Sequence, residues 1–192
     1  MRKKNTIISP PAPDEYPAYA EMYMKWVPRD GQILQSMKDQ VGKTMELVSG
    51  LSDEQLAYRY APGKWTIPEV MVHICDDERI YAYRALRIGR GDQTPLPGFE
   101  QDDYVPFSKA NGRSVKSILK EYRTVRKATL SLFRSFNAED LLRRGTADGQ
   151  AVSVRALLYH LAGHELHHLE IVKEKYLFYH DKRAVGILSV QE

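Results

Sequence analysis

Four long segments of the chain repeat apolar residues every three or four positions, and this spacing limits the folds that the chain can adopt. Each repeat predicts a helix with one apolar face. The expected helices span residues 31–49, 66–88, 114–136 and 153–179. The only β-like stretch is AVGILSV, residues 184–190, and no segment alternates as a central strand would. The pattern therefore predicts an all-α protein, a four-helix bundle with long connecting loops.

Local signals mark several helix ends. Thr66 and Glu69 form a capping box before the second helix, and Pro68 is tolerated that early in a helix. Two shorter helices are expected, in SDEQLAYRY (52–60) and FNAED (136–140), and GTADGQ (145–150) is interpreted as a turn.

The chain divides into three parts. The bundle is expected over residues 30–180. Residues 1–29, rich in proline and tyrosine, are expected to form an irregular arm, and residues 181–192 a C-terminal tail. A loop of 25 residues, 89–113, separates the second and third helices. Because compact domains seldom carry such loops without a functional reason, its aromatic side chains are expected either to cover a pocket or to pack the loop down: Phe99, Tyr104 and Phe107.

Charge and cysteine content exclude several classes of protein. The net charge of +3 is only mildly basic, and acids are interspersed with bases, so we expect no nucleic-acid partner. The single cysteine, Cys75, excludes an internal disulfide framework and is typical of a reducing compartment. Prolines stand where a signal peptide needs its apolar run, and no apolar run approaches the roughly 18 residues of a membrane span. We therefore expect a cytoplasmic protein without a membrane partner.

The last expected helix carries the most informative residues. His164 and His168 occupy positions of its inward stripe where apolar residues are expected. They are four residues apart, so their side chains lie on one face about 6 Å apart and can share one metal ion. The alternative is a pair of core histidines hydrogen-bonded to carbonyl groups. His160 and His167 lie within about 60° of His164 on the helical wheel, and either could replace a member of the pair.

A third ligand is expected from the second helix, where His73 lies beside the apolar stripe. Asp76 and Asp77 follow three and four residues later. They could complete the ligand set, orient an imidazole or act as a general base. Alternatively, these carboxylates form a solvated patch with Arg79 or Arg84. The residues thus predict a three-histidine site with a carboxylate beside it.

The sequence HELHH, residues 164–168, also matches the zincin motif H-E-x-x-H. A metzincin ends its helix with a glycine so that a third histidine can return to the metal. The corresponding positions here are Ile171 and Glu174, and the helical stripe continues through them. Only 24 residues follow His168, too few for a later helix that supplies a carboxylate. We interpret the match as a coincidence of spacing, with Glu165 facing a neighbouring helix or solvent.

Two stretches, YAPGKWTIPEVMVHICDDERIYAYRALRIGRGDQTPLPGFEQDDYV and LLYHLAGHELHHLEIVKEKY, resemble the DinB-like superfamily of metalloenzymes. The resemblance covers residues 30–180 and rests on G-K-W before the second helix and on the histidine spacing. It implies a four-helix bundle with an up-down-down-up course, and a homodimer. Carried over residue by residue, it implies one divalent ion, variously nickel, zinc, iron or manganese, held by His73, His164 and His168.

Characterised members of that family include thiol-dependent S-transferases and a maleylpyruvate isomerase that uses a low-molecular-weight thiol. The resemblance therefore implies a small-molecule substrate and a thiol cosubstrate. Three neutral imidazoles leave positions open on a metal for water or a thiol. We expect a divalent-metal-dependent transferase or hydrolase. The alternatives are a non-catalytic metal-binding or stress-related protein and a helical interaction protein with core histidines.

Overall fold

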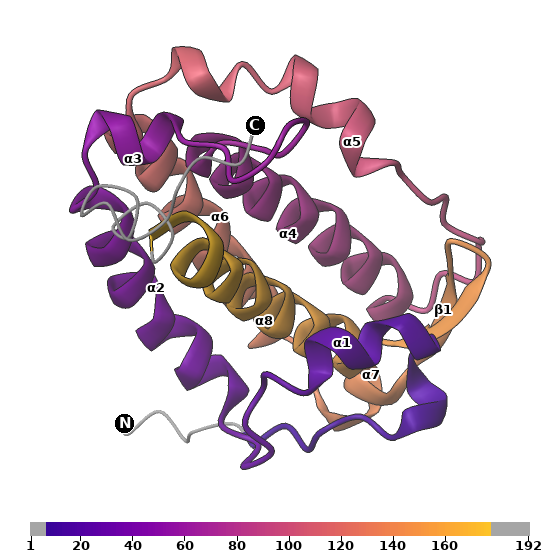
Figure 1. Cartoon of the computed structure of the whole chain (residues 1–192). Helices are drawn as coiled ribbons and strands as arrows, with labels where there is room; N and C mark the ends of the chain where they lie inside the picture. The colour runs from indigo at the N-terminus through magenta and orange to yellow at the C-terminus, as the bar shows by residue number, and fades with distance from the viewer. Residues whose placement is uncertain (1–6, 178–192) are drawn as a thin grey trace.

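The structure is a computed structural model that describes residues 7–177 of the 192-residue chain. The expected four-helix bundle is confirmed (Figure 1). Its long helices are α2 (Ile33–Ser49), α4 (Ile67–Gly89), α6 (Val115–Phe133) and α8 (Val154–Ile171), and α8 continues into a π-helical stretch, η5 (Val172–Leu177). The shorter elements are η1 (Pro13–Glu15), η2 (Ala18–Ala20), α1 (Glu21–Met24), α3 (Asp53–Ala57), α5 (Gln101–Tyr104), η3 (Val105–Phe107), η4 (Ala110–Gly112), α7 (Ala138–Leu142), β1 (Arg144–Ala147) and β2 (Gln150–Ser153).

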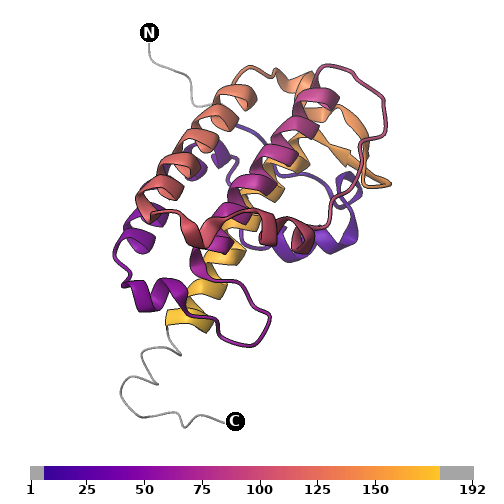
Figure 2. The ribbon, with the colours of Figure 1, turned by 90° about the horizontal axis from the view of Figure 1, so that it is seen from above.

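Helices α4 and α6 run in the same direction (Figure 2). Their carboxyl ends meet where Arg90 donates a hydrogen bond to the hydroxyl of Ser135. Helix α8 runs in the opposite direction, so its end lies beside the start of α4. Tyr176, which follows α8, donates to the carbonyl oxygen of Trp65, just before α4, at 2.7 Å. Helix α2 runs with α8 (Figure 1). The course is therefore up-down-down-up, and the long connection between α4 and α6 returns along the bundle.

The helix starts follow from their capping residues. Thr66 Oγ1 accepts from the Glu69 amide at 3.3 Å, and the Glu69 carboxylate accepts from the Thr66 amide at 2.7 Å, which confirms the predicted capping box. Ser153 caps α8 with a single hydrogen bond, in which its hydroxyl accepts from the Ala156 amide at 3.1 Å. These caps fix where α4 and α8 begin, and therefore which of their residues face each other.

The apolar spacing of residues 114–136 predicts that Val125 and Leu132 face inward from α6, and the structure differs from this prediction. Val125 and Leu132 are only partly buried, whereas Arg126, one position after Val125, is 1% exposed. Arg126 can face the interior because carboxylates from two other helices, Glu78 and Glu165, neutralise its buried guanidinium.

A β-hairpin stands where only a turn was predicted, so the expectation of no strand before the tail was wrong there. Strands β1 and β2 are antiparallel, with Ala147 opposite Gln150. Asp148 and Gly149 between them both have positive φ, at 54° and 69°, as a two-residue hairpin turn requires. The β-like stretch at 184–190 lies outside the described residues.

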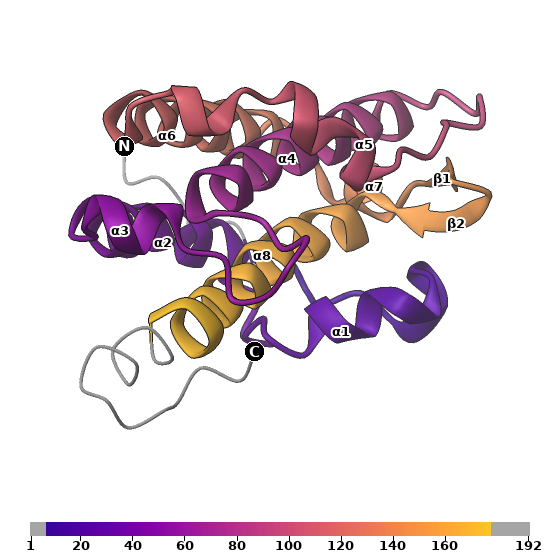
Figure 3. The same cartoon turned by 45° about the horizontal axis from the view of Figure 1, so that its top comes forward.

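Where an irregular arm was expected over residues 1–29, the described part contains three short helices, η1, η2 and α1, between residues 13 and 24. Helix α1 lies along α8, and the hairpin lies at the end of the bundle where α8 begins (Figure 3). The close approach of α1 needs Gly163, since a Cβ there would lie 2.2 Å from the carbonyl oxygen of Tyr23. Within residues 7–177, no helix is long and apolar enough to span a membrane.

Candidate metal centre

Three histidines converge in the interior between α4 and α8. Nε2 of His164 lies 3.0 Å from Nε2 of His73 and 3.1 Å from Nε2 of His168. One nitrogen from each ring lies within 4.8 Å of the other two. The structure therefore brings together the three residues that the sequence singled out, and it places His160 and His167 outside this group.

Hydrogen bonding among the three rings leaves one of them unsatisfied. A ring nitrogen carries either one proton or one lone pair, so Nε2 of His164 can form only one good hydrogen bond. It nevertheless faces two imidazoles, and the structure shows no other hydrogen-bond partner for these three Nε2 atoms within residues 7–177. A cation, in contrast, would accept a lone pair from all three rings.

Burial keeps these imidazoles neutral, as metal ligands must be. Burial lowers the pKa of His168 to about 3, and the nearby His73 ring acts in the same direction. Burial also lowers the pKa of His73, and it lowers that of His164 well below the usual value, with His168 and His73 adding to the effect. Zinc–imidazole bonds of about 2.0–2.1 Å in a tetrahedral arrangement would place ligand nitrogens roughly 3.3 Å apart, which is close to the two Nε2 separations from His164.

Asp77 lies behind His164. Its Oδ2 atom is 3.4 Å from Nδ1 of His164 and 3.6 Å from Nε2 of His160, and neither contact has hydrogen-bond geometry. The ring of His160 stacks on Tyr81, with 3.8 Å between ring centroids and 3° between planes. Asp76, the other predicted carboxylate, turns away and pairs with Arg79 at 3.2 Å, so the expectation of a solvated pair holds for Asp76 alone.

A family model that describes the DinB superfamily matches residues 38–172. The chain belongs to the DinB superfamily. Among curated proteins, this DinB chain is 27% identical over 143 residues to a "putative metal-dependent hydrolase" of Oceanobacillus iheyensis. The match covers 73% of this chain and 81% of that protein.

Two solved structures share the fold of this DinB chain. YfiT from Bacillus subtilis, described as "a probable metal-dependent hydrolase with an unusual four-helix bundle topology", has a TM-score of 0.66 at 14% identity. The alignment covers 93% of this chain and 94% of YfiT. The DinB-like protein YjoA from Bacillus subtilis has a TM-score of 0.53 at 19% identity, over 84% of this chain and 96% of YjoA.

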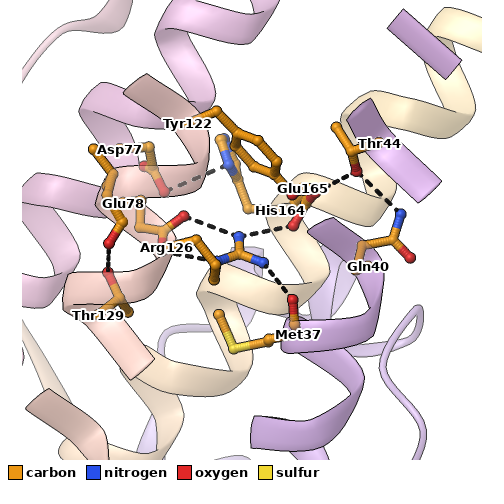
Figure 4. Close-up of polar contacts among 11 residues, drawn as sticks. Met37, Gln40, Thr44, Asp77, Glu78, Tyr122, Arg126, Thr129, His164 and Glu165 are labelled. Atoms are coloured by element: carbon orange, nitrogen blue, oxygen red, sulfur yellow. Dashed lines mark hydrogen bonds and ion pairs between the residues drawn. The ribbon is translucent and has the colours of Figure 1, made fainter. Parts of the chain in front are cut away.

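Glu165, the glutamate of the HELHH sequence, is part of a buried network of hydrogen bonds in this DinB chain (Figure 4). Glu165 accepts from Arg126 Nη2 at 2.7 Å and from the hydroxyls of Thr44, at 2.7 Å, and Tyr122. It is 1% exposed, and its carboxylate lies in the interface with α2 and α6, where both oxygens have partners. A zincin glutamate must reach the metal-bound water, so the interpretation of the zincin match as a coincidence agrees with this geometry.

Aromatic residues that the sequence did not single out enclose the histidines of this DinB site. The ring centroids of Trp65 and His73 lie 4.8 Å apart, and those of His164 and Tyr23, a residue of α1, lie 5.3 Å apart. G-K-W in the DinB pattern was a signal for Trp65, but the segment around Tyr23 has no period that would place it. Of the loop aromatics, Phe107 is 82% exposed and covers nothing, whereas Phe99 is half-buried at the cavity beside His164.

Proposed function

We propose that this protein is a divalent-metal-dependent hydrolase whose ion is held by His73, His164 and His168. The observation that carries the proposal is the convergence of three Nε2 atoms, from the buried His73 and His164 and the partly buried His168, whose mutual hydrogen bonds cannot all form. The names of the Oceanobacillus iheyensis relative and of YfiT support the same class of reaction.

His73, His164 and His168 would hold the ion and leave positions open, and the ion would supply Lewis acidity there, which would lower the pKa of a water to about 7 and that of a thiol further. The chain's own residues prepare this site. Asp77 beside Nδ1 of His164 favours the tautomer that carries its proton on Nδ1, which leaves the Nε2 lone pair free. The Asp77 carboxylate also lines the cavity next to His164, so it can accept a proton from a nucleophile bound there.

Water is the proposed nucleophile because no feature of the described residues identifies a thiol site. S-transfer from a low-molecular-weight thiol is the second reaction to test, since the same open positions suit either nucleophile. Nickel, zinc, iron and manganese are the ions to test, because an all-histidine ligand set does not choose among several of them.

Metal analysis of the untagged protein tests the proposal. We expect about one divalent ion per chain, lost in His73→Ala and in His164→Ala and retained in His167→Ala, a control on the same helix. Ester hydrolysis should stop when a chelator removes the ion and return when the ion is restored. Absence of bound metal after incubation with each of the four ions would overturn the proposal, as would unchanged hydrolysis by His164→Ala.

A further inference from the structure

Within residues 7–177 the protein buries two arginines, and only one of them has a counter-ion. Arg126 is 1% exposed and pairs with the carboxylates of Glu78 and Glu165 (Figure 4). Arg84 is 4% exposed and forms no ion pair with any residue in that range. Buried guanidinium groups are almost always paired, because an unpaired charge in the interior is costly. Arg84 therefore offers a place for an anion that the described chain does not supply.

Most of the hydrogen-bonding capacity of Arg84 is unused. A guanidinium has five N–H groups. Nη2 donates to the carbonyl oxygen of Pro97 at 2.8 Å, and Nε and Nη1 have no hydrogen-bond partner among the described residues. Neither nitrogen is sealed off by protein, since the fully enclosed side-chain N and O atoms without a partner in residues 7–177 are those of Asp77 and His160. A ligand can therefore reach the unused N–H groups of Arg84.

The space beside Arg84 leads to the metal centre. A cavity of about 160 Å³ has Arg84, Asp77 and His164 in its wall. It has room for about five water molecules or for one small polar group. Its walls come from α1, α4 and α8, from the loop after α4 and from the hairpin turn. A small molecule held by Arg84 would therefore extend toward the side of the site that Asp77 occupies.

Aromatic rings hold the Arg84 guanidinium in place. Its central carbon lies 4.8 Å from the centroid of the Tyr81 ring and 5.9 Å from that of Phe99. Tyr81 in turn stacks on His160, with 3.8 Å between ring centroids. These contacts and the hydrogen bond to Pro97 fix the position of the guanidinium before a ligand arrives, so binding costs less conformational entropy.

Three carboxylates line the same cavity and oppose an anion: Asp77, Glu100 and Asp148. Glu100 and Asp148 are exposed, so solvent and salt screen their charges. Asp77 is buried, but it precedes Arg84 by seven residues on α4, a helical rise of about 10 Å. A carboxylate in direct contact with the guanidinium, at about 2.8 Å, therefore gains more from Arg84 than it loses to these more distant charges.

We propose that this cavity binds a carboxylate group of the substrate, with the Arg84 guanidinium as its partner. The inference rests on the proposed hydrolase, because it names the class of substrate for that site: a small ester or amide that carries a carboxylate apart from its scissile bond. A planar carboxylate matches the guanidinium through two parallel N–H···O hydrogen bonds. The anchored substrate would then place its scissile bond toward His164.

Three probes of similar shape and different charge test the inference: butyrate, butyramide and n-butylammonium. Calorimetry or NMR titration uses the metal-free full chain at neutral pH, so that no ion can bind the carboxylate. We expect butyrate to bind about tenfold more tightly than butyramide, because hydrogen bonds between charged groups are strong, and n-butylammonium to bind most weakly. Equal binding of butyrate and butyramide, tighter binding of n-butylammonium, or no detectable binding of butyrate would overturn the inference.

Matched variants locate the effect on one guanidinium. Arg84→Gln should remove the preference for butyrate, whereas Arg84→Lys should keep part of it, because an ammonium has the charge without the planar pair of donors. Arg87→Gln is the control on the same helix, since Arg87 already pairs with Asp92, and it should leave the preference unchanged. Butyrate binding that needs zinc and persists in Arg84→Gln would assign the carboxylate to the ion and overturn the inference.

A surface variant keeps the test decisive if the Arg84 variants fail to fold. Asp148 lies in the exposed hairpin turn, where asparagine tolerates the positive φ. Asp148→Asn removes a negative charge from the cavity wall and should strengthen butyrate binding about two- to threefold. Unchanged or weaker butyrate binding in this variant would count against the inference.

The proposal and the proposed function fail in different ways. A protein that binds one ion and hydrolyses esters with and without a carboxylate equally well would remain a hydrolase without the inferred selectivity. A protein that binds butyrate through Arg84 but takes up no metal would keep the carboxylate site and lose the hydrolase assignment.

Discussion

Nη2 of Arg126 donates to Oε2 of Glu165 at 2.7 Å, and this buried pair fixes the rotation of the helix that carries two of the three converging histidines. The same guanidinium donates twice to Glu78, at 2.8 and 2.9 Å, and once to the carbonyl oxygen of Met37. One side chain thereby connects α2, α4, α6 and α8 (Figure 4). Glu165 directly follows His164 and lies three positions before His168. The contact between Arg126 and Glu165 therefore holds α8 in the rotation at which both histidines face His73.

Replacing Arg126 with methionine should lower the free energy of unfolding by roughly 3–5 kcal/mol, because two buried carboxylates lose their counter-ion. Urea denaturation of the variant against the natural chain measures the loss. A change below about 1 kcal/mol would show that the carboxylates are protonated or solvated in the folded protein.

Glu165→Gln separates a structural role from a zincin role. The structure predicts a free energy of unfolding lower by about 1–3 kcal/mol, with the metal content retained. Glu170→Gln is the matched control on the same helix, since Glu170 forms a surface pair with Lys173 at 3.4 Å and no other ion pair within residues 7–177. If Glu165→Gln abolished hydrolysis while unfolding as the natural chain does, Glu165 would be a general base.

His168→Ala and His167→Ala test which histidines hold the ion. His168 faces the other two rings, whereas His167 lies against Tyr23, with ring centroids 5.4 Å apart. We expect at least a tenfold loss of metal affinity in His168→Ala and less than a twofold change in His167→Ala. Competition with a chromogenic chelator measures both affinities. Similar losses in the two variants would contradict the assignment.

Glu15 should make stability depend on pH in the acid range. Burial raises its pKa, but hydrogen bonds from Arg155, Ser153 and the Ala12 amide outweigh this and lower it to about 2 from an ordinary 4.5. A lowered pKa stabilises the folded state above the unfolded-state value, and the contribution of about 3 kcal/mol disappears as the pH falls from about 4.5 to about 2. The difference in free energy of unfolding between the natural chain and Glu15→Gln should therefore shrink from pH 7 to pH 2.5. A difference that does not change with pH would rule out this linkage.

Gly163→Ala should separate α1 from α8, because its methyl group would meet the backbone of Tyr23. We expect a loss of about 1–3 kcal/mol in the free energy of unfolding and weaker ligand binding in the cavity that Tyr23 lines. Gly42→Ala is the control, since nothing lies within 4 Å of a Cβ there, and alanine should stabilise the middle of α2 by up to about 1 kcal/mol. Equal effects of the two substitutions would contradict the close contact.

The sequence was sufficient for the bundle and for the three converging histidines. Apolar spacing locates the long helices, and His164 and His168 stand out because they interrupt an apolar stripe. His73 could be selected because it is the only histidine of α4. In each case the signal lies within one helix, where periodicity reports directly on which side chains face inward.

The residues around the three histidines could not be predicted from the periodicity of single helices. Arg126 could not be selected from the sequence because its two partners, Glu78 and Glu165, lie on other helices, and no local pattern reports on such a pairing. Tyr23 belongs to a segment without a period. The hairpin had a local signal, the Asp148–Gly149 pair, but the strands beside it are too short to show a convincing alternation.

Helices α4 and α8 hold the three histidines, whereas much of the cavity wall beside them comes from segments between or before the long helices: Tyr23, Phe99, Glu100 and Asp148. Such connections vary in length and composition far more readily than packed helices do. Related chains can therefore diverge in what they act upon while inheriting the same four-helix scaffold.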